Sequence, residues 1–204
     1  RSRLPVTILL ALSGWDTAPW VERFTRHAPD HEIVTLDQAH DIQSIKYTCA
    51  WKPPEGVLAR YSNLKVIFSL GAGVDHLLGD RELPNVPVVR VVSDNLTMRM
   101  TEYVVQHVLM HHRQQRMLDD MQARKDWREV DQPAADQGRV GIMGLGVLGT
   151  DAAKALKMLG FQVLAWSRSA KEIDGVRCFA GSDTLPAFLS QVDILVCLMP
   201  HTPD

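Results

Sequence analysis

The chain has 204 residues, of which 46% are hydrophobic and 23% are charged, and its formal net charge is −2. This is the composition of an ordinary soluble globular protein with one or two domains. The near-neutral balance excludes the basic surface typical of proteins that bind nucleic acid or anionic membranes, so neither is expected as a partner.

The first part of the chain alternates apolar runs with short helical segments. The runs span residues 6–11, 33–36, 47–51, 64–69 and 86–92, and a helix is expected over residues 15–27. Strands that alternate with helices predict a small parallel sheet with helices on both faces. The first run is too short for a membrane-spanning helix, which needs about 20 apolar residues.

A long helix is predicted next, from residue 96 to about residue 121. This stretch contains no Gly or Pro, and Met100, Val104 and Val108 recur at helical spacing. The polar residues 122–129 continue the helix, and Pro133 ends it. The change of character places a boundary near residue 95, with one domain over residues 1–95 and a second over residues 96–204, both incomplete.

A glycine-rich turn follows an apolar strand that starts at residue 139. It reads Gly144, Leu145, Gly146, Val147, Leu148 and Gly149, a complete G-x-G-x-x-G. An amphipathic helix follows, with Gly160 as its left-handed stop, and then a second strand over residues 161–166. In such a unit the first glycine allows a tight turn, the second admits a pyrophosphate to the backbone amides, and the third brings helix and strand together. The context predicts dinucleotide binding at a helix N-terminus, and the alternative is a turn that only packs the helix.

The end of the second strand bears on the choice of cofactor. NAD-selective sites usually place Asp or Glu about 20 residues beyond the first glycines. Here the strand ends in Ser167, Arg168 and Ser169. A carboxylate would repel a 2′-phosphate, whereas Arg168 can form a forked pair with one. We predict NADP(H) as the preferred cofactor and NAD(H) as the second choice, unless Arg168 is only a solvated strand end.

Three further elements are predicted in the last part of the chain. They are a short strand at residues 177–179, a helix at 184–190 and an apolar strand at 193–199. The last strand lacks polar alternation, as expected for a strand buried on both faces. Thr202, Pro203 and Asp204 suit the start of another helix, so we expect the chain to be a piece of a larger protein.

The cysteines and histidines predict no metal site. Cys49, Cys178 and Cys197 are far apart, which favours free thiols in a reducing, cytoplasmic compartment, with Cys49 and Cys197 buried. His107 and His111 are spaced to share one helix face, but no third ligand is evident.

Four stretches resemble the D-isomer-specific 2-hydroxyacid dehydrogenase family, in its glyoxylate/hydroxypyruvate reductase A subgroup. Residues 70–77 resemble its substrate-carboxylate loop and residues 100–104 the start of its interdomain helix. Residues 140–149 resemble its cofactor loop, and residues 198–203 resemble the loop at the nicotinamide. Residues 166–169 also resemble the NADP-type strand end of this subgroup.

The resemblance implies two doubly wound parallel-sheet domains, a flavodoxin-like substrate domain followed by an incomplete Rossmann domain. It implies hydride transfer between NADP(H) and a small 2-oxo acid such as glyoxylate or hydroxypyruvate. The substrate carboxylate would be held by Gly71, Ala72 and Gly73, with Trp51 lining the same site. The cofactor would contact the glycine turn, residues 167–169, and Leu198, Met199, Pro200 and Thr202.

The catalytic Arg, Glu and His of the family are expected beyond Asp204, so no catalytic residue is assigned within residues 1–204 and this chain alone is expected to be inactive. The resemblance also implies a homodimer formed through residues 117–130, with Trp127 as a candidate anchor. The alternative function is a dinucleotide-sensing corepressor on the same scaffold. A short-chain dehydrogenase is a weaker rival, because an α/β domain precedes the glycine turn.

Overall fold

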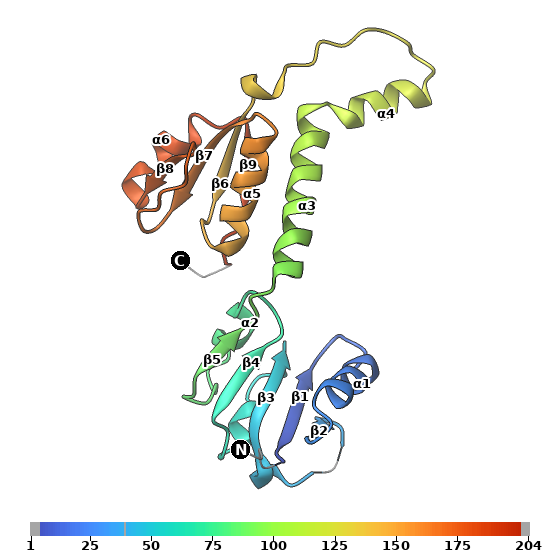
Figure 1. The fold of residues 1–204 in the computed structure, drawn as a ribbon, viewed down its shortest axis with the longest axis vertical. Coiled ribbons are helices and arrows are strands. Elements are labelled where there is room, and N and C mark those ends of the chain that lie inside the picture. The colour runs from blue at the N-terminus through green and yellow to red at the C-terminus, as the bar shows by residue number, and fades with distance from the viewer. Residues whose placement is uncertain (1–4, 39, 201–204) are drawn as a thin grey trace. The chain divides into compact units, whose positions relative to one another are not determined.

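The computed structural model describes residues 5–38 and 40–200, and the contacts divide the chain into two units (Figure 1). The first unit runs to Val92 and includes Pro200, and the second is Ser93–Met199. Each unit is built on one parallel sheet. Among the described helices, none combines the length and apolar character that crossing a membrane requires.

The first unit contains a five-stranded sheet in the order β2-β1-β3-β4-β5. This is the flavodoxin-like order, as predicted. The strands are β1 (Thr7–Leu12), β2 (Glu32–Thr35), β3 (Ile45–Trp51), β4 (Val66–Ser69) and β5 (Val88–Arg90). All five predicted strands are present, with their ends shifted slightly.

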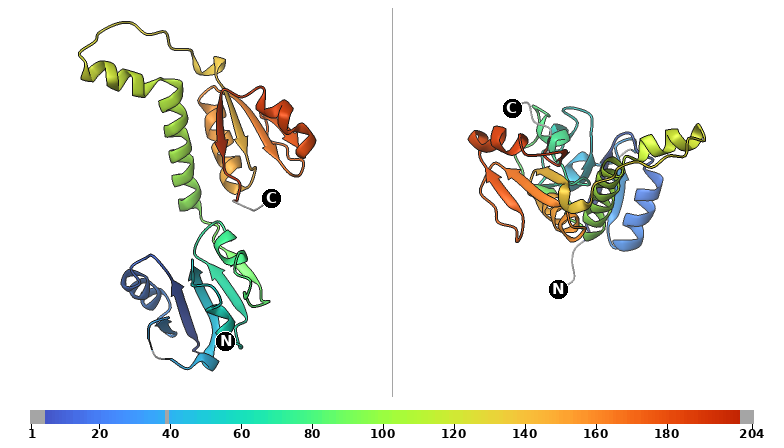
Figure 2. Two further views of the ribbon diagram at one scale, coloured as in Figure 1. Left: turned by 180° about the vertical axis from the view of Figure 1, so that it is seen from behind. Right: turned by 90° about the horizontal axis from the view of Figure 1, so that it is seen from above.

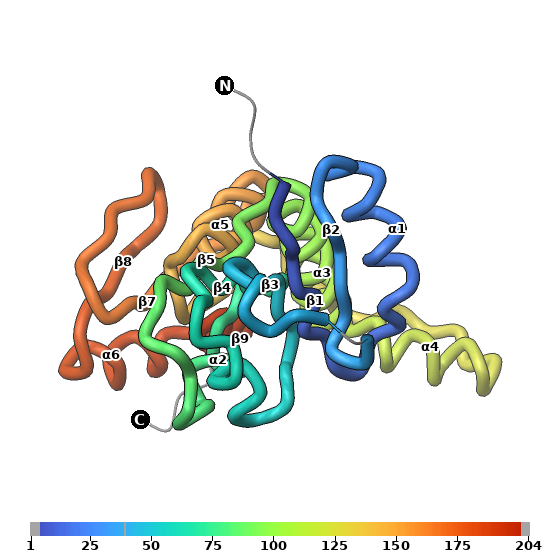
Figure 3. Tube along the Cα trace, turned by 90° about the horizontal axis from the view of Figure 1, so that it is seen from below, coloured from blue at the N-terminus to red at the C-terminus, as the bar shows by residue number. Residues whose placement is uncertain are grey.

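Both faces of this sheet carry apolar side chains. Helix α1 (Ala18–His27) lies beside β1 and β2 (Figure 3). Its Trp20 and Phe24 side chains pack against one face of the sheet. It begins later than the predicted residue 15, because Thr17 is its N-cap and a proline occupies its first turn. The other face packs against the short turns η1 (Ile42–Ser44) and η2 (Leu58–Arg60) and against α2 (Asp75–Leu78).

The second unit contains a four-stranded sheet in the order β8-β7-β6-β9. Counted within the unit, this is 3-2-1-4, the beginning of the Rossmann order. Its strands are β6 (Arg139–Met143), β7 (Gln162–Ser167), β8 (Arg177–Ala180) and β9 (Ile194–Cys197). Its shorter helical elements are η3 (Ala135–Gln137), α5 (Val147–Met158), η4 (Ser182–Thr184) and α6 (Leu185–Leu189).

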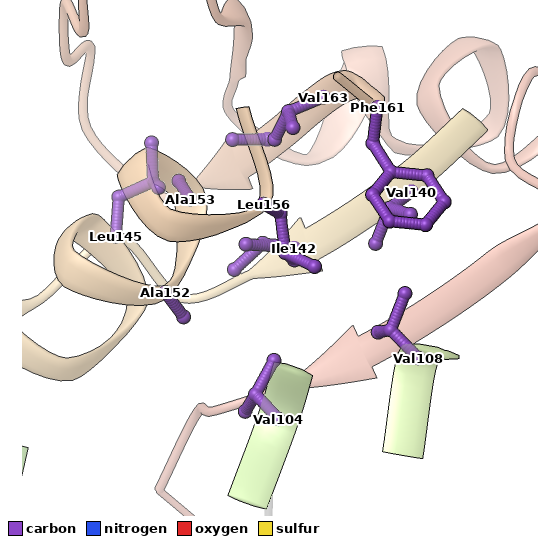
Figure 4. Close-up of a cluster of buried hydrophobic side chains, with 11 residues drawn as sticks. Val104, Val108, Val140, Ile142, Leu145, Ala152, Ala153, Leu156, Phe161 and Val163 are labelled. Atoms are coloured by element: carbon purple, nitrogen blue, oxygen red, sulfur yellow. The ribbon is translucent and has the colours of Figure 1, made fainter. Parts of the chain in front are cut away.

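The core of this unit lies between the sheet and two helices. Helix α5 contributes Ala152 and Leu156, and α3 (Asp94–His112) contributes Val104 and Val108, all of them packed near Ile142 of β6 (Figure 4). Gly160, which follows α5, has φ +94. This confirms the prediction that a glycine in the left-handed conformation ends the helix.

The prediction of one continuous helix to residue 121 is wrong, because the helix is interrupted after His112. Helix α3 ends at His112, and α4 (Gln115–Ala123) follows Gln114, whose φ is +52 (Figure 2). The Gln114 side chain donates to the carbonyl of Asp131 (3.1 Å), and Gln132 donates to the carbonyl of Arg113 (2.7 Å). The returning chain therefore stabilises the break, and residues 126–134 are irregular instead of helical.

Strand β9 is not buried on both faces, contrary to the prediction. Ile194 and Val196 pack against the α3–α5 core, whereas Leu195 is 48% exposed and Cys197 is also exposed. Helix α6 lies on β7 and β8, so this face of β9 has less cover. Cys197 is therefore an exposed thiol, while Cys49 is buried as predicted, and its burial raises the pKa of the Cys49 thiol to about 11.

Candidate functional site

Three loops of the second unit meet at one edge of its sheet. Met143 of β6 is in register with Trp166 of β7 and with Cys197 of β9. Because the strands are parallel, the glycine turn, residues 167–169 and residues 198–199 leave the sheet side by side. The chain places β7 and β8 on one side of β6 and β9 on the other. Such a topological switch point is where open α/β sheets bind ligands.

The three glycines of the turn differ in what they require. Gly144 has φ +98, and a Cβ there would lie 3.0 Å from the carbonyl group of Leu198. A Cβ on Gly149 would lie 1.9 Å from the carbonyl oxygen of Gly144. Gly146 has φ −79, and a Cβ there would meet nothing within 4 Å. Folding therefore requires the first and third glycines, whereas the space over Gly146 is open to a ligand.

The N-terminus of α5 carries unused hydrogen-bond donors. Its N-cap is Gly146, which has no side chain to cap the helix, and the amide of Thr150 is bonded to the Gly146 carbonyl (2.9 Å). Within the described chain, the amides of Gly146, Val147 and Leu148 donate no hydrogen bond. Unpaired amides and the helix dipole together favour an anion here.

The end of β7 presents a cation at the same edge. Arg168 and Ser169 are exposed, and no carboxylate of the described residues pairs with Arg168. Ser167 is only 9% exposed, and its hydroxyl donates to the carbonyl of Ser169 (2.7 Å). Of the three predicted residues, Arg168 and Ser169 are therefore the ones accessible to a ligand.

Of the remaining residues predicted for the cofactor, Leu198 and Met199 lie next to Gly144 of the turn. The amide of Leu198 donates to the Met143 carbonyl (2.8 Å), which holds the loop after β9 against β6. Met199 is exposed, and the side chain of Leu145 is buried. Pro200 is exposed and is grouped with the first unit. Thr202 lies outside the described residues.

The candidate carboxylate loop of the first unit connects β4 to α2. A Cβ on Gly71 would lie 2.4 Å from the Trp51 ring, and a Cβ on Gly73 would lie 2.7 Å from the Asp75 carboxylate. Glycine at positions 71 and 73 therefore allows the loop backbone to lie close to the Trp51 ring and the Asp75 carboxylate. Trp51, which was predicted to line this site, does contact the loop at Gly71.

Trp51 is part of a row of stacked aromatic rings. Trp51 stacks on Trp15 (4.5 Å), which stacks on Trp20 (5.2 Å), and the His76 ring is tilted against Trp51 at 4.9 Å. The Nε2 atom of His76 is buried, and burial lowers the pKa of this imidazole from 6.5. Lys52 adds a cation 5.5 Å from the Trp51 ring. No sequence pattern connects Trp15 or Trp20 with this loop, because their stacking on Trp51 depends on the tertiary fold.

His107 and His111 on α3 have no third metal ligand beside them among the described residues. The ring of His107 is hydrogen-bonded to the carbonyl of Tyr103 (2.8 Å), and His111 is exposed. Across residues 5–38 and 40–200, no three His, Cys, Asp or Glu side chains are placed to hold a metal ion.

Comparison with known proteins identifies the family. Residues 105–204 match the family described as D-isomer specific 2-hydroxyacid dehydrogenase, NAD binding domain. Glyoxylate/hydroxypyruvate reductase A of Serratia proteamaculans is 36% identical over 191 residues, which cover 91% of this chain and 61% of that protein. The chain belongs to the D-isomer specific 2-hydroxyacid dehydrogenase family. The predicted resemblance is confirmed.

Solved structures of 2-hydroxyacid dehydrogenases share the fold. An NADPH-dependent glyoxylate/hydroxypyruvate reductase of Sinorhizobium meliloti, in complex with NADP and sulfate, has a TM-score of 0.90 and 41% identity over 98% of this chain. A family member from Xanthobacter autotrophicus, in complex with NADPH and MES, has a TM-score of 0.90 and 35% identity over 97% of this chain. The chain covers 64% of each of these two proteins.

Proposed function

We propose that the chain is part of an oxidoreductase that transfers a hydride between NADP(H) and a small 2-oxo or 2-hydroxy acid, such as glyoxylate or hydroxypyruvate. The observation that carries the proposal is the edge of the second sheet, where unpaired amides at the start of α5 and the exposed Arg168 follow the ends of neighbouring strands. Relatives that hold NADP or NADPH support the same cofactor.

The residues at this edge fit a phosphorylated dinucleotide. The pyrophosphate would approach Gly146, where a backbone contact is unobstructed, and would accept hydrogen bonds from the amides of residues 146–148. Arg168 would pair with the 2′-phosphate, which favours NADP(H) over NAD(H). Residues 198–200 would contact the nicotinamide end. When bound, the nicotinamide supplies the hydride chemistry, and the chain supplies orientation and charge.

The loop over residues 71–73 would hold the carboxylate of the 2-oxo acid, with Trp51 as an apolar wall. Within the described chain the amides of Ala72 and Gly73 donate no hydrogen bond, so both are free to bind an anion. The proton donor and the carbonyl-polarising cation of the family are not assigned to any described residue of this chain.

When glyoxylate or hydroxypyruvate is added to the full-length protein together with NADPH, NADPH should be consumed. The fall in NADPH absorbance measures this consumption. A fluorescence titration of the 204-residue chain with NADPH separates binding from turnover. Binding without turnover of any 2-oxo acid by the full-length protein would contradict the reductase and favour the corepressor alternative, which the named relatives do not support.

We also propose a cytoplasmic homodimer. All three cysteines are free, which fits a reducing compartment. Trp127 follows α4 and is fully exposed, and a large unburied aromatic side chain is typical of interfaces.

Sedimentation equilibrium should give twice the chain mass for the protein and a lower average mass for Trp127→Ser. Met158→Ser is the matched control, because Met158 is also highly exposed but lies on α5. A monomeric parent protein, or an equal effect of both substitutions, would contradict this interface.

A further inference from the structure

The hydroxyl of Ser69 lies inside the loop that follows β4. Ser69 is completely buried, and its Oγ atom is 3.2 Å from the carbonyl oxygens of Gly71 and Gly73 and 3.2 Å from the amide nitrogen of Gly71. A serine hydroxyl has one donor and two acceptor positions. It therefore accepts the Gly71 N–H and donates to one of the two carbonyls at a time.

These contacts fix the direction of two peptide groups. In a planar trans peptide the N–H points opposite to the C=O. Because the Gly71 carbonyl faces Ser69, the N–H of Ala72 points away from it. The Gly73 carbonyl likewise turns the N–H of Val74 away. The intervening carbonyl of Ala72 accepts from Arg90 at 3.5 Å, so the N–H of Gly73 points away from Arg90.

The amides differ in whether they are free to bind a ligand. The Gly71 amide is already used by Ser69. Within the described part of the chain, the amides of Ala72, Gly73 and Val74 donate no hydrogen bond. An anion at this loop would therefore be held by residues 72–74, one residue further along than the predicted set that begins at Gly71. Successive free amides of this kind form anion-binding concavities.

We propose that Ser69 is a positioning residue for the substrate, because its hydroxyl orients the peptide groups whose amides bind the carboxylate of the 2-oxo acid. The proposal deepens the proposed function and rests on it for the identity of the substrate. Ser69 does not contact the substrate itself. Trp51 limits where the loop lies, through its contact with Gly71, whereas Ser69 sets which way the peptide groups point.

Ser69→Ala should raise KM for glyoxylate about tenfold, with kcat changed less and KM for NADPH unchanged, because a preorganised set of donors is lost. Ser69→Thr, which keeps the hydroxyl, should restore most of the affinity. Thr48→Val is the matched control, since Thr48 is another completely buried hydroxyl and donates to the Leu9 carbonyl (3.1 Å) away from the loop. It should lower the melting temperature and leave KM for glyoxylate unchanged. An unchanged KM in Ser69→Ala, or an equal rise in Thr48→Val, would overturn the proposal.

A second measurement does not depend on turnover. In the ¹⁵N-labelled chain titrated with oxalate, the amide signals of Ala72, Gly73 and Val74 should shift, and the shifts should saturate at higher oxalate in Ser69→Ala. If the full-length protein reduces glyoxylate but oxalate moves none of these signals, the positioning role is wrong and the proposed function stands. If the signals move but no 2-oxo acid is reduced, the loop geometry is supported and the proposed function fails.

Discussion

Gly149→Ala should destabilise the second unit by about 3 kcal/mol or more, the range seen when a side chain is forced into packed backbone. The new methyl group would lie 1.9 Å from the carbonyl oxygen of Gly144 and 3.0 Å from its carbon. Gly144 cannot move away easily, because its amide is bonded to the carbonyl of Trp166 (2.9 Å). Urea unfolding, followed by circular dichroism, measures the loss.

Gly146→Ala is the matched control, since it adds the same methyl group three residues earlier. Gly146 has a φ that alanine adopts freely, and a Cβ there meets nothing within 4 Å. The free energy of unfolding of the Gly146→Ala variant should stay within about 1 kcal/mol of that of the parent protein, which is the size of an N-cap change. NADPH affinity should fall at least about tenfold, because the methyl group fills the space left for the pyrophosphate. Wild-type stability in Gly149→Ala, or wild-type affinity in Gly146→Ala, would contradict the assigned roles.

Arg168→Ala should raise the Kd for NADPH about 10- to 100-fold and leave the Kd for NADH nearly unchanged. The estimate follows from about 1.5–3 kcal/mol for hydrogen bonds to a charged group, reduced by the exposure of Arg168. NADH has no 2′-phosphate, so it loses no partner. Fluorescence titration with each cofactor gives both constants.

The control for this experiment is Arg177→Ala. Arg177 is another exposed arginine of the second unit, with its guanidinium 5.1 Å from the Phe179 ring and 2.7 Å from the Gln191 side chain. Its removal should change the affinity for neither cofactor. Equal losses for NADPH and NADH in Arg168→Ala would show that Arg168 does not select between them.

The sequence predicts the strands and the glycine turn well because their signals are local. Apolar runs bounded by turn residues locate the strands, Gly160 adopts the predicted left-handed conformation, and Gly144, predicted to allow a tight turn, has a positive φ. The break at Gln114 has no local signal, since it depends on hydrogen bonds with residues 131 and 132. The exposure of Leu195 depends on which helices cover β9, and no pattern within that strand reveals it.

The candidate site was predictable in outline but not in its supporting contacts. The resemblance located residues 71–73, and the structure places Trp51 against Gly71. The resemblance did not indicate that the Gly71 amide donates a hydrogen bond to the Ser69 hydroxyl, because this contact depends on the curvature of the loop. The hydroxyl of Ser167 is also occupied, so of the three residues predicted at the end of β7, Arg168 and Ser169 are the exposed ones.

In both loops the unpaired donors belong to peptide groups and not to side chains. Genetic drift can exchange the side chains at Ala72 or Val147 without deleting an amide, because every amino acid except proline carries one. Selection should therefore exclude proline from positions 72–74, 147 and 148, and should exclude every residue with a Cβ from position 146, where the pyrophosphate needs the space. At the other positions of these loops, which substitutions the fold accepts should depend more on the space around each Cβ than on the chemical character of the new side chain.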